Sequence, residues 1–413
     1  MCGLRKFNIM NVLFLTLVQI NSLQERGIYQ DLLSNFRDNG HNVYVVCPIE
    51  RRNKSKTQII KKEGIIILKV KTLNIQKANF LEKGIGTLAL EYQFLKSIKI
   101  FFKEVKFDIV LYSTPPITLV KVIKFIKKRD NAMSYLLLKD IFPQNAVDLM
   151  MFKEYGLLHK YFLKKEKQLY QVSDYIGCMS QANVDYILKH NKEIDRNKIE
   201  INPNSIQPIA VRKSKKERDF IRSKYNLPLD KYIFIYGGNL GKPQGLDFLL
   251  HVVENNNNNL CFFLIVGNGT EYEKIRNWFS INNPKNAKLF NSLPKEDYDR
   301  LVQNCDVGLI FLDKKFTIPN FPSRLLSYLE MKLPVISATD KVSDIGDILE
   351  ENNCGIKVIS GDLERMNVAI DKIICSNNLE QMGENSWKLL IDKFNVSISY
   401  RLIVEKYNMW KNV

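Results

Sequence analysis

The sequence contains few of the residues from which metal and disulfide sites are usually built. Four histidines are scattered over 413 residues, and seven cysteines occur singly, without a C-x-x-C pair. Zinc sites are typically built from closely spaced cysteines and histidines. An odd number of isolated cysteines is typical of reduced thiols in the cytosol. We therefore expect no metal site, no disulfide framework and a cytoplasmic location.

The sequence also lacks an apolar run long enough to span a bilayer. The first candidate, residues 10–20, is too short and is interrupted by Thr16 and Gln19. Basic residues precede this run, but no small-residue cleavage site of a signal peptide follows it. We predict that it is the first buried strand of a domain. Met10 is then a candidate for the natural start, with residues 1–9 a loose extension.

The chain has enough apolar material for large cores, since 45% of its residues are hydrophobic and 25% are charged. At about 150 residues per domain, its length predicts two or three units. Short apolar runs alternate with amphipathic stretches, which is typical of parallel strands alternating with helices. The predicted strands cover residues 11–17, 43–48, 65–70, 109–112, 134–138, 232–236, 261–266, 287–289, 307–311, 335–337 and 355–358. Prolines and turn formers at 199–208 mark the domain boundary.

Glycines cluster after the first predicted strand of the second half. The run Gly237-Gly238-Asn239-Leu240-Gly241-Lys242-Pro243-Gln244-Gly245 leads into an apolar helix. Glycines at a strand-to-helix turn let backbone N–H groups approach an anion, whose charge the helix dipole favours. A tight turn that merely needs glycine is the alternative. Because Lys242 lies among these glycines, we favour phosphate binding.

Two later segments point to the same edge of the predicted sheet. Gly267 and Gly269 follow the next strand, and a helix is predicted to begin after Pro322 and Ser323. Ligands of open α/β sheets gather at the carboxyl ends of strands. The N–H groups of that helix, with the Arg324 guanidinium, could hold a diphosphate. An ordinary capped helix is the alternative, but the order of the three segments favours a phosphate clamp.

These motifs together resemble the donor-binding domain of family-4 retaining glycosyltransferases of the GT-B fold. The order Gly-Gly-Asn-Leu-Gly-x-x-Gln-Gly, Val-Gly-Asn-Gly, Phe-Pro-Ser-Arg-Leu-Leu-Ser-Tyr-Leu, Pro-Val-Ile is close to the branch that makes O-antigen and capsule, including acetamido-deoxysugar transferases. Residues 39–43, 140–143 and 202–205 of the first half resemble the same branch. The resemblance covers nearly the whole chain.

The resemblance implies an α/β protein of two Rossmann-like, doubly wound domains facing a central cleft. Residues 1–200 would bind the acceptor, residues 201–394 would bind a nucleotide-diphosphate sugar, and a helix at 395–413 would cross back. Transfer would retain the anomeric configuration and need neither metal nor cofactor. The donor-binding residues it implies are Gly27, Gly238, Asn239, Leu240, Gly241, Gln244, Gly267, Gly269, Pro322, Ser323, Leu325 and Ser327.

The sequence departs from the wider family at charged positions. Asn239 and Gln244 stand where the common pattern has an arginine and a lysine. Ser327 stands at the second position of the usual pair of glutamates, and Pro319 at the first. The leaving diphosphate must then be neutralised by other groups, for which Lys242 and Arg324 are the candidates. The missing glutamate contact suggests an unusual, deoxy donor sugar.

Asp140 is the candidate catalytic residue of the first half. It follows an apolar strand at residues 135–138, so its carboxylate should point into the interdomain cleft. There it could bind or deprotonate the acceptor hydroxyl. A turn or cap former ahead of Ile-Phe-Pro is the alternative.

Two motifs mimic other sites. Asp297-Tyr298-Asp299 matches a metal-binding D-x-D, but acids are preferred in the first turn of a helix, which Pro294 suggests here. Residues 84–89 mimic a dinucleotide fingerprint, yet no strand precedes them, which argues against a dehydrogenase.

The net charge of +17 is concentrated in the first half. Residues 1–200 carry 33 Lys and Arg against 19 Asp and Glu, whereas residues 201–413 carry 28 against 25. The basic segments 96–106, 121–129 and 160–167 mix lysine with apolar residues at roughly helical spacing. Solvated faces and codon bias are alternatives, but we favour contact with an anionic inner membrane surface.

We therefore expect a peripheral enzyme on the inner face of the membrane. It would transfer a sugar, an acetamido-deoxyhexose, to a polyprenyl-diphosphate-linked saccharide in bacterial capsule or O-antigen synthesis. A sugar-nucleotide 2-epimerase of the same fold and a nucleic-acid-binding protein remain alternatives. No basic-aromatic recognition motif is present, so we expect no nucleic-acid partner.

Overall fold

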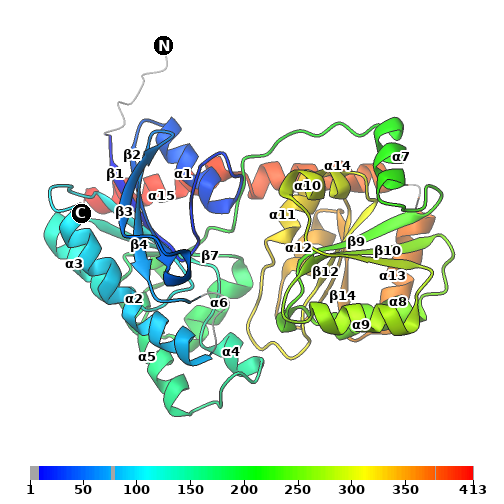
Figure 1. The fold of residues 1–413 in the computed structure, drawn as a ribbon, viewed down its shortest axis with the longest axis horizontal. Helices are drawn as coiled ribbons and strands as arrows, with labels where there is room; N and C mark the ends of the chain where they lie inside the picture. Colours follow the sequence, from blue (N-terminus) through cyan, green and yellow to red (C-terminus); the bar gives the residue numbers. More distant parts are fainter. Residues whose placement is uncertain (1–8, 76–79, 377, 413) are drawn as a thin grey trace. The chain divides into compact units, whose positions relative to one another are not determined.

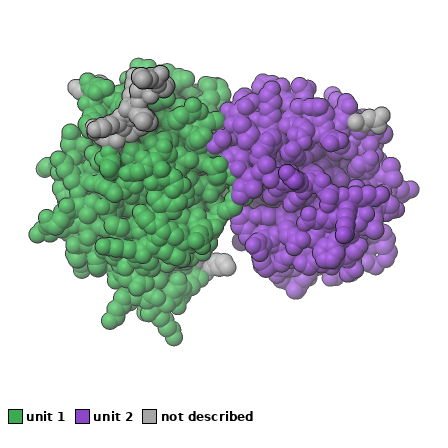
Figure 2. All heavy atoms as spheres, turned by 90° about the horizontal axis from the view of Figure 1, so that it is seen from above, with its two compact units in different colours: residues 1–207, 396–413 green, residues 208–395 purple. Residues whose placement is uncertain are grey.

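The computed structural model describes residues 9–75, 80–376 and 378–412. The chain forms two compact units, residues 1–207 with 396–413 and residues 208–395 (Figure 2). Each unit is built around a largely parallel sheet that is covered by helices (Figure 1). The first unit therefore contains both ends of the chain, and the second unit lies between them in sequence.

Unit 1 has an eight-stranded sheet within its described residues, in the order β3-β4-β2-β1-β5-β6-β7-β8. Its elements are β1 (Asn11–Leu15), α1 (Ile28–Asp38), β2 (Asn42–Glu50), η1 (Arg51–Asn53), β3 (Gln58–Lys62), β4 (Ile65–Thr72), α2 (Phe80–Phe101), β5 (Ile109–Ser113), α3 (Val120–Asp130), β6 (Met133–Leu138), α4 (Gln144–Asp148), α5 (Leu157–Val172), β7 (Tyr175–Cys178), α6 (Gln181–His190), η2 (Arg196–Lys198), β8 (Ile199–Ile201) and α15 (Val396–Lys411). The predicted strands of this half are all present.

One edge of the sheet in unit 1 is antiparallel. Strand β3 pairs antiparallel with β4 through a hairpin. The two residues between these strands, Glu63 and Gly64, both have positive φ, as a tight hairpin turn requires. Strand β3 consists largely of polar, exposed residues, so it carries no apolar run by which it could be recognised.

The C-terminal helix α15 completes the core of unit 1. Its residues Val396, Tyr400, Ile403, Val404 and Tyr407 belong to the same buried cluster as the strands β1, β2 and β6. His41, which lies in the Asn-Gly-His motif, is bonded through Nε2 to the Tyr400 hydroxyl at 2.9 Å. Its Nδ1 accepts a 3.3 Å hydrogen bond from the Met10 N–H. Since Nδ1 is an acceptor, the proton of the neutral ring lies on Nε2.

Helix α3 packs its apolar face inward, so the predicted apolar contact of this segment with a membrane is wrong for the residues on that face. Val122, Ile123 and Ile126 have no exposed surface. The Lys127 ammonium pairs with Asp174 at 2.7 Å. Arg129 donates to the backbone carbonyls of Phe102 and Val105 and to its neighbour Asp130. These groups are therefore committed to the fold of unit 1.

Among its described residues, unit 2 has a six-stranded sheet in the order β11-β10-β9-β12-β13-β14, and all neighbouring strands in it are parallel. Its elements are α7 (Lys215–Lys224), β9 (Tyr232–Asn239), η3 (Lys242–Gln244), α8 (Leu246–Asn255), β10 (Cys261–Asn268), α9 (Tyr272–Asn282), β11 (Ala287–Phe290), α10 (Lys295–Gln303), β12 (Val307–Phe311), α11 (Arg324–Glu330), β13 (Val335–Thr339), α12 (Ile345–Glu351), β14 (Gly355–Ile359), α13 (Leu363–Cys375) and α14 (Leu379–Lys393). Successive strands are added on one side of β9 up to β11 and on its other side from β12 onward, so a ligand crevice is expected at the carboxyl ends of β9 and β12.

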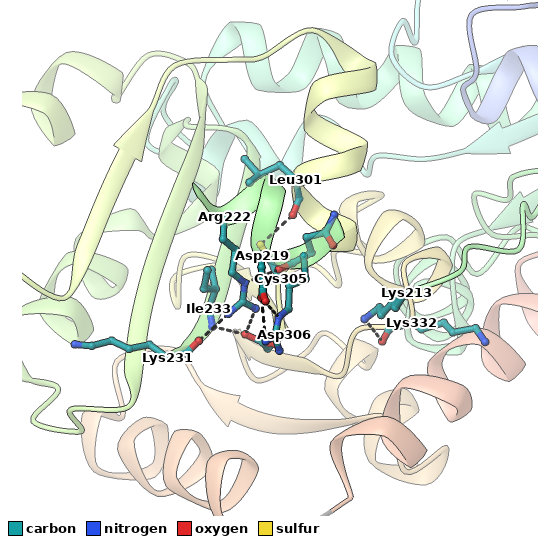
Figure 3. Close-up of polar contacts among 11 residues, drawn as sticks. Lys213, Asp219, Arg222, Lys231, Ile233, Leu301, Cys305, Asp306 and Lys332 are labelled. Atoms are coloured by element: carbon teal, nitrogen blue, oxygen red, sulfur yellow. Dashed lines mark hydrogen bonds and ion pairs between the residues drawn. The ribbon is translucent and has the colours of Figure 1, made fainter. Parts of the chain in front are cut away.

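A buried arginine fixes helix α7 at the opposite, amino-terminal edge of this sheet (Figure 3). Arg222 is 1% exposed and donates to the carbonyls of Asn304 and Lys231. Its Nη2 lies 2.7 Å from the Asp306 carboxylate, which also accepts from the Ile233 N–H at 2.6 Å. These bonds join α7 to β9 and to the residues before β12, so the cluster stabilises the fold of unit 2.

Candidate functional site

The first two glycines of the run, Gly237 and Gly238, lie within strand β9, and only the later glycines belong to the turn. Strands β9 and β10 remain paired through Gly238 with Gly267 and Asn239 with Asn268. The turn follows as the 3-10 helix η3, and Gly245, at φ 57°, leads from it into α8. The predicted strands were too short because glycine is a weak strand former, whereas a parallel partner of equal length keeps this one extended.

Packing explains most of these glycines. A Cβ atom at Gly237 would collide with the Tyr298 hydroxyl, and one at Gly267 would collide with the Gly238 carbonyl. A Cβ at Gly269 would meet the Leu240 carbonyl. Gly238 differs, since it is exposed, has φ 117°, and has the Arg324 guanidinium 3.9 Å from the position of a Cβ. Gly238 therefore lies beside Arg324, one of the two predicted cations.

Arg324, the first residue of α11, is held on two sides. Its Cζ lies 4.2 Å from the centroid of the Tyr236 ring. Its Nη2 donates a 2.6 Å hydrogen bond to Oε1 of Gln244. The Tyr236 hydroxyl donates in turn to the Asn239 carbonyl at 2.9 Å. Gln244 therefore positions the arginine instead of contributing a charge.

Tyr236 was not predicted as a site residue. It is buried at the end of the apolar run of β9, where an aromatic residue is expected in any core. Burial raises the pKa of its hydroxyl, although the nearby Arg324 lowers it in part. The only available signal was its position directly before the two glycines.

Two buried polar atoms of α11 have no hydrogen-bond partner among the residues that the structure describes. They are Nη1 of Arg324 and Oγ of Ser327, one helical turn apart. An unpaired buried polar atom is costly, so such atoms usually meet a ligand or water. A guanidinium and a hydroxyl both suit phosphate oxygens or sugar hydroxyls. The site residues thus converge on a group that accepts hydrogen bonds.

Other predicted donor-binding residues have different surroundings. The side chains of Leu240 and Leu325 are fully buried, so only their backbones can face a ligand. Lys242 is exposed on η3. Ser323 precedes α11, but its backbone is helical and its side chain makes no capping bond, contrary to the predicted cap. Half-buried Pro322 comes directly before it.

Gly241 and Gly27 complete the predicted set. A Cβ at Gly241 would lie 2.9 Å from the Asn239 amide nitrogen. Gly27 precedes α1 of unit 1 with extended backbone that any residue adopts. A Cβ there would meet only the end of the flexible Gln30 side chain. The structure therefore supplies no conformational reason for glycine at position 27.

The acids of the D-x-D motif form ion pairs on helix α10. Asp297 pairs with Lys224 at 3.0 Å, and Asp299 pairs with Lys295 at 2.8 Å. Within the described part of the chain, no group of three or more His, Cys, Asp or Glu side chains could hold a metal ion. The dinucleotide-like residues 84–89 lie within helix α2, which is not the strand-to-helix turn that such a motif needs.

Asp140 lies at the carboxyl edge of the unit 1 sheet, two residues after β6. Its N–H and that of Lys139 donate to the Thr114 hydroxyl at 3.1 and 2.9 Å, which ties the ends of β5 and β6 together. Desolvation raises the pKa of the Asp140 carboxyl to about 6, although the residue remains exposed. A raised pKa and an exposed side chain occur together when a carboxylate contacts solvent on one side and has protein atoms around its other sides.

Lys139 is a site candidate that sequence reasoning missed. Burial lowers the pKa of its ammonium group to about 7, and Nζ donates to the Asn202 carbonyl at 3.2 Å. It lines a small pocket with Tyr29 and with Asn204 and Ser205 of the predicted 202–205 motif. A lysine next to Asp140 at the end of an apolar strand was the available signal.

The two Rossmann-like units define a protein of the GT-B fold. Sucrose-phosphate synthase from Thermosynechococcus elongatus matches 98% of this chain and 99% of its own, with 13% identity and a TM-score of 0.73. Anabaena HepE in complex with UDP matches 97% of this chain and 100% of its own, with 13% identity and a TM-score of 0.70. These likenesses show the fold.

Residues 217–388, within unit 2, match the family described as Glycosyl transferases group 1. "Probable glycosyltransferase WbjE" of Pseudomonas aeruginosa is 21% identical over 78% of this chain and 79% of its own. "Putative colanic acid biosynthesis glycosyl transferase WcaI" of Escherichia coli is 24% identical over 32% of each chain. Unit 2 thus carries a group 1 glycosyltransferase domain, and the findings together support a glycosyltransferase. No helix in the described residues is long and apolar enough to cross a membrane.

Proposed function

We propose that this chain transfers a sugar from a nucleotide-diphosphate donor to a polyprenyl-diphosphate-linked saccharide during bacterial capsule or O-antigen synthesis. The donor sugar is an acetamido-deoxyhexose, transfer retains its anomeric configuration, and no metal takes part. The likeness to WbjE and WcaI, whose names specify a glycosyltransferase and colanic acid biosynthesis, supports the polysaccharide context. The UDP complex of HepE supports a nucleotide donor.

One observation carries the proposal, namely the Arg324 guanidinium next to the exposed Gly238, with an Nη1 that has no hydrogen-bond partner among the residues that the structure describes. A leaving diphosphate gains negative charge as the glycosidic bond breaks. A guanidinium that is already held in place by Tyr236 and Gln244 can stabilise this charge without reorganising. Lys242, exposed on the neighbouring η3, is proposed to add a second positive charge when donor is bound.

Ser327 is proposed to face the donor sugar. It stands where the related enzymes are expected to have a glutamate, and its hydroxyl is shorter and neutral. A hydroxyl at this position suits a sugar that lacks one hydroxyl group or carries an acetamido group, because a carboxylate there would lose its partner. In unit 1, Asp140 is proposed to bind or deprotonate the acceptor hydroxyl.

A donor screen tests the proposal directly. The melting temperature of the full chain is measured with UDP-, GDP- and dTDP-sugars, since a donor at 100 times its dissociation constant stabilises the fold by about 2.7 kcal/mol. We expect one nucleotide class to stabilise wild type and Arg276→Ala, an exposed control on α9, but not Arg324→Ala. If no donor stabilises wild type, or if Arg324→Ala responds equally, the proposal fails.

A further inference from the structure

Unit 1 exposes an unusual group of apolar side chains between α4 and the first turns of α5. Leu157 is 89% exposed, Met150 75% and Tyr155 72%, and Met151, Leu158 and Tyr161 are exposed beside them in sequence. Figure 1 shows these elements at the lower end of unit 1 in that view. We call residues 150–161 the α4–α5 surface. Single exposed apolar residues are common, but so many within twelve positions indicate an interaction site.

The α4–α5 surface is held in place from beneath. The rings of Phe142 and Phe152 lie 5.1 and 6.2 Å from that of Phe162, so an aromatic cluster supports the segment. The Tyr155 N–H donates to Nδ1 of the buried His159 at 3.1 Å. Because the segment has its own apolar support, the outward side chains are not needed to complete the core.

Positive charge accompanies these apolar side chains. Residues 150–165 contain Lys153, Lys160, Lys164 and Lys165 but a single acid, Glu154. The first three lysines are exposed, and none of them forms an ion pair with another described residue. Lys165 lies 5.8 Å from the Tyr161 ring centroid. The surface therefore offers apolar side chains and uncompensated ammonium groups together.

We propose that the α4–α5 surface docks unit 1 on an anionic lipid bilayer. Leucine and methionine side chains enter the boundary of the acyl chains, tyrosines prefer the interfacial region, and lysines reach the phosphates of the headgroups. A second copy of the chain fits less well, since a symmetric contact would bring the lysines of both copies together. This inference rests on the proposed function, in which the acceptor is lipid-linked.

Vesicle co-sedimentation of the full chain tests the inference. The vesicles are phosphatidylcholine alone or mixed with phosphatidylglycerol, at low and high salt. We expect binding to the anionic vesicles, weakened about tenfold or more by Met150→Ser with Leu157→Ser. Changing Lys153, Lys160 and Lys164 to Gln should weaken it by about two powers of ten at low salt and less at high salt.

Two control variants match these changes elsewhere on the protein. Ile281→Ser removes an apolar side chain that is 82% exposed on α9 of unit 2. Changing the exposed Lys121, Lys124 and Lys128 of α3 to Gln removes equal charge from unit 1. Neither should alter binding as strongly. Equal binding to neutral vesicles, a larger effect of the α3 variant, or a dimer in solution that Leu157→Ser dissociates would overturn the inference.

Sugar transfer to a short-chain, detergent-soluble acceptor separates this inference from the proposed function. The α4–α5 variants should retain wild-type transfer in that assay while losing vesicle binding. If wild type binds vesicles but neither wild type nor any variant transfers sugar, the result counts against the proposed function alone. Transfer without anionic vesicle binding by wild type would count against the docking surface alone.

Discussion

Arg324 stacks over the ring of Tyr236 and donates a 2.6 Å hydrogen bond to Gln244, which stands where related enzymes are expected to have a lysine. The two contacts hold the guanidinium in one orientation, while its Nη1 has no partner in the described part of the chain. A neutral glutamine therefore concentrates the fixed positive charge of this edge on one side chain. The consequence is that a single substitution should remove most of it.

Arg324→Ala should lower kcat/KM for sugar transfer by about two to three powers of ten, because a charge-assisted contact to a leaving group contributes about 2–4 kcal/mol. Circular dichroism and the melting temperature should show an intact fold. Gln244→Ala should have a smaller effect, since it releases the arginine without removing the charge. Near wild-type turnover of Arg324→Ala would contradict its assignment.

Asp297→Ala combined with Asp299→Ala should leave transfer unchanged and leave the enzyme equally active with and without EDTA. Both acids pair with lysines at partly exposed positions, and such pairs contribute about 1 kcal/mol or less. Initial rates with and without EDTA check this. Activity that is lost and then restored by manganese would show a metal site at α10.

Asp140→Asn should lower kcat by about two powers of ten if the carboxylate binds or deprotonates the acceptor. Its pKa of about 6 lies above the ordinary 3.8, so the group is ionised only above about pH 6. The wild-type rate should therefore rise through pH 6, and this limb should be absent from the variant. Measuring kcat/KM against pH for both proteins tests this. If Asp140→Asn shows the same rise through pH 6 as wild type, Asp140 is not the group that causes it.

Arg222→Met should destabilise unit 2 by about 3–5 kcal/mol, because it leaves the Asp306 carboxylate and two carbonyls without their shared donor. Arg218→Met, four residues earlier and more exposed, should change stability by less than about 1 kcal/mol. Urea unfolding followed for the unit 2 transition compares them. Equal effects would mean that the buried cluster contributes little.

His41 should make unit 1 sensitive to acid. Burial lowers the pKa of its ring below 6.5, so the folded state favours neutral imidazole. Its stabilisation is complete above pH 6.5 and is lost as the pH falls from 6.5 towards the lower folded pKa, by at most about 1.4 kcal/mol per pH unit. Urea unfolding between pH 5 and 8 should show a flatter dependence for His41→Gln than for wild type. His190→Gln, at an exposed position, should keep the wild-type slope.

Sequence patterns predicted most of the apolar, buried strands, but they missed the short strands β7 and β8. Strand β12 has the predicted limits, residues 307 and 311, because a continuous apolar run has no other stable place in an α/β protein. Strand β3 escaped prediction because it is polar. Helix α3 shows another limit, since an amphipathic pattern does not reveal whether its apolar face meets a core or a membrane.

The sequence predicted which residues belong to the candidate site more fully than it predicted the contacts among them. Glycines at the strand ends and Arg324 could be recognised by their order along the chain. The stacking on Tyr236 and the bond to Gln244 join residues that are far apart in sequence, so no local spacing encodes them. The buried Oγ of Ser327 likewise becomes informative only when its surroundings are known.

The place of α15 in the core of unit 1 has a consequence for how the chain is made. A ribosome completes residues 208–395 before it synthesises the helix that carries Tyr400 and Tyr407. Unit 2, although it comes later in the sequence, can therefore finish folding first, while unit 1 waits with an uncovered apolar surface. A premature stop codon near position 395 would thus spare unit 2 and expose unit 1 to aggregation and proteolysis.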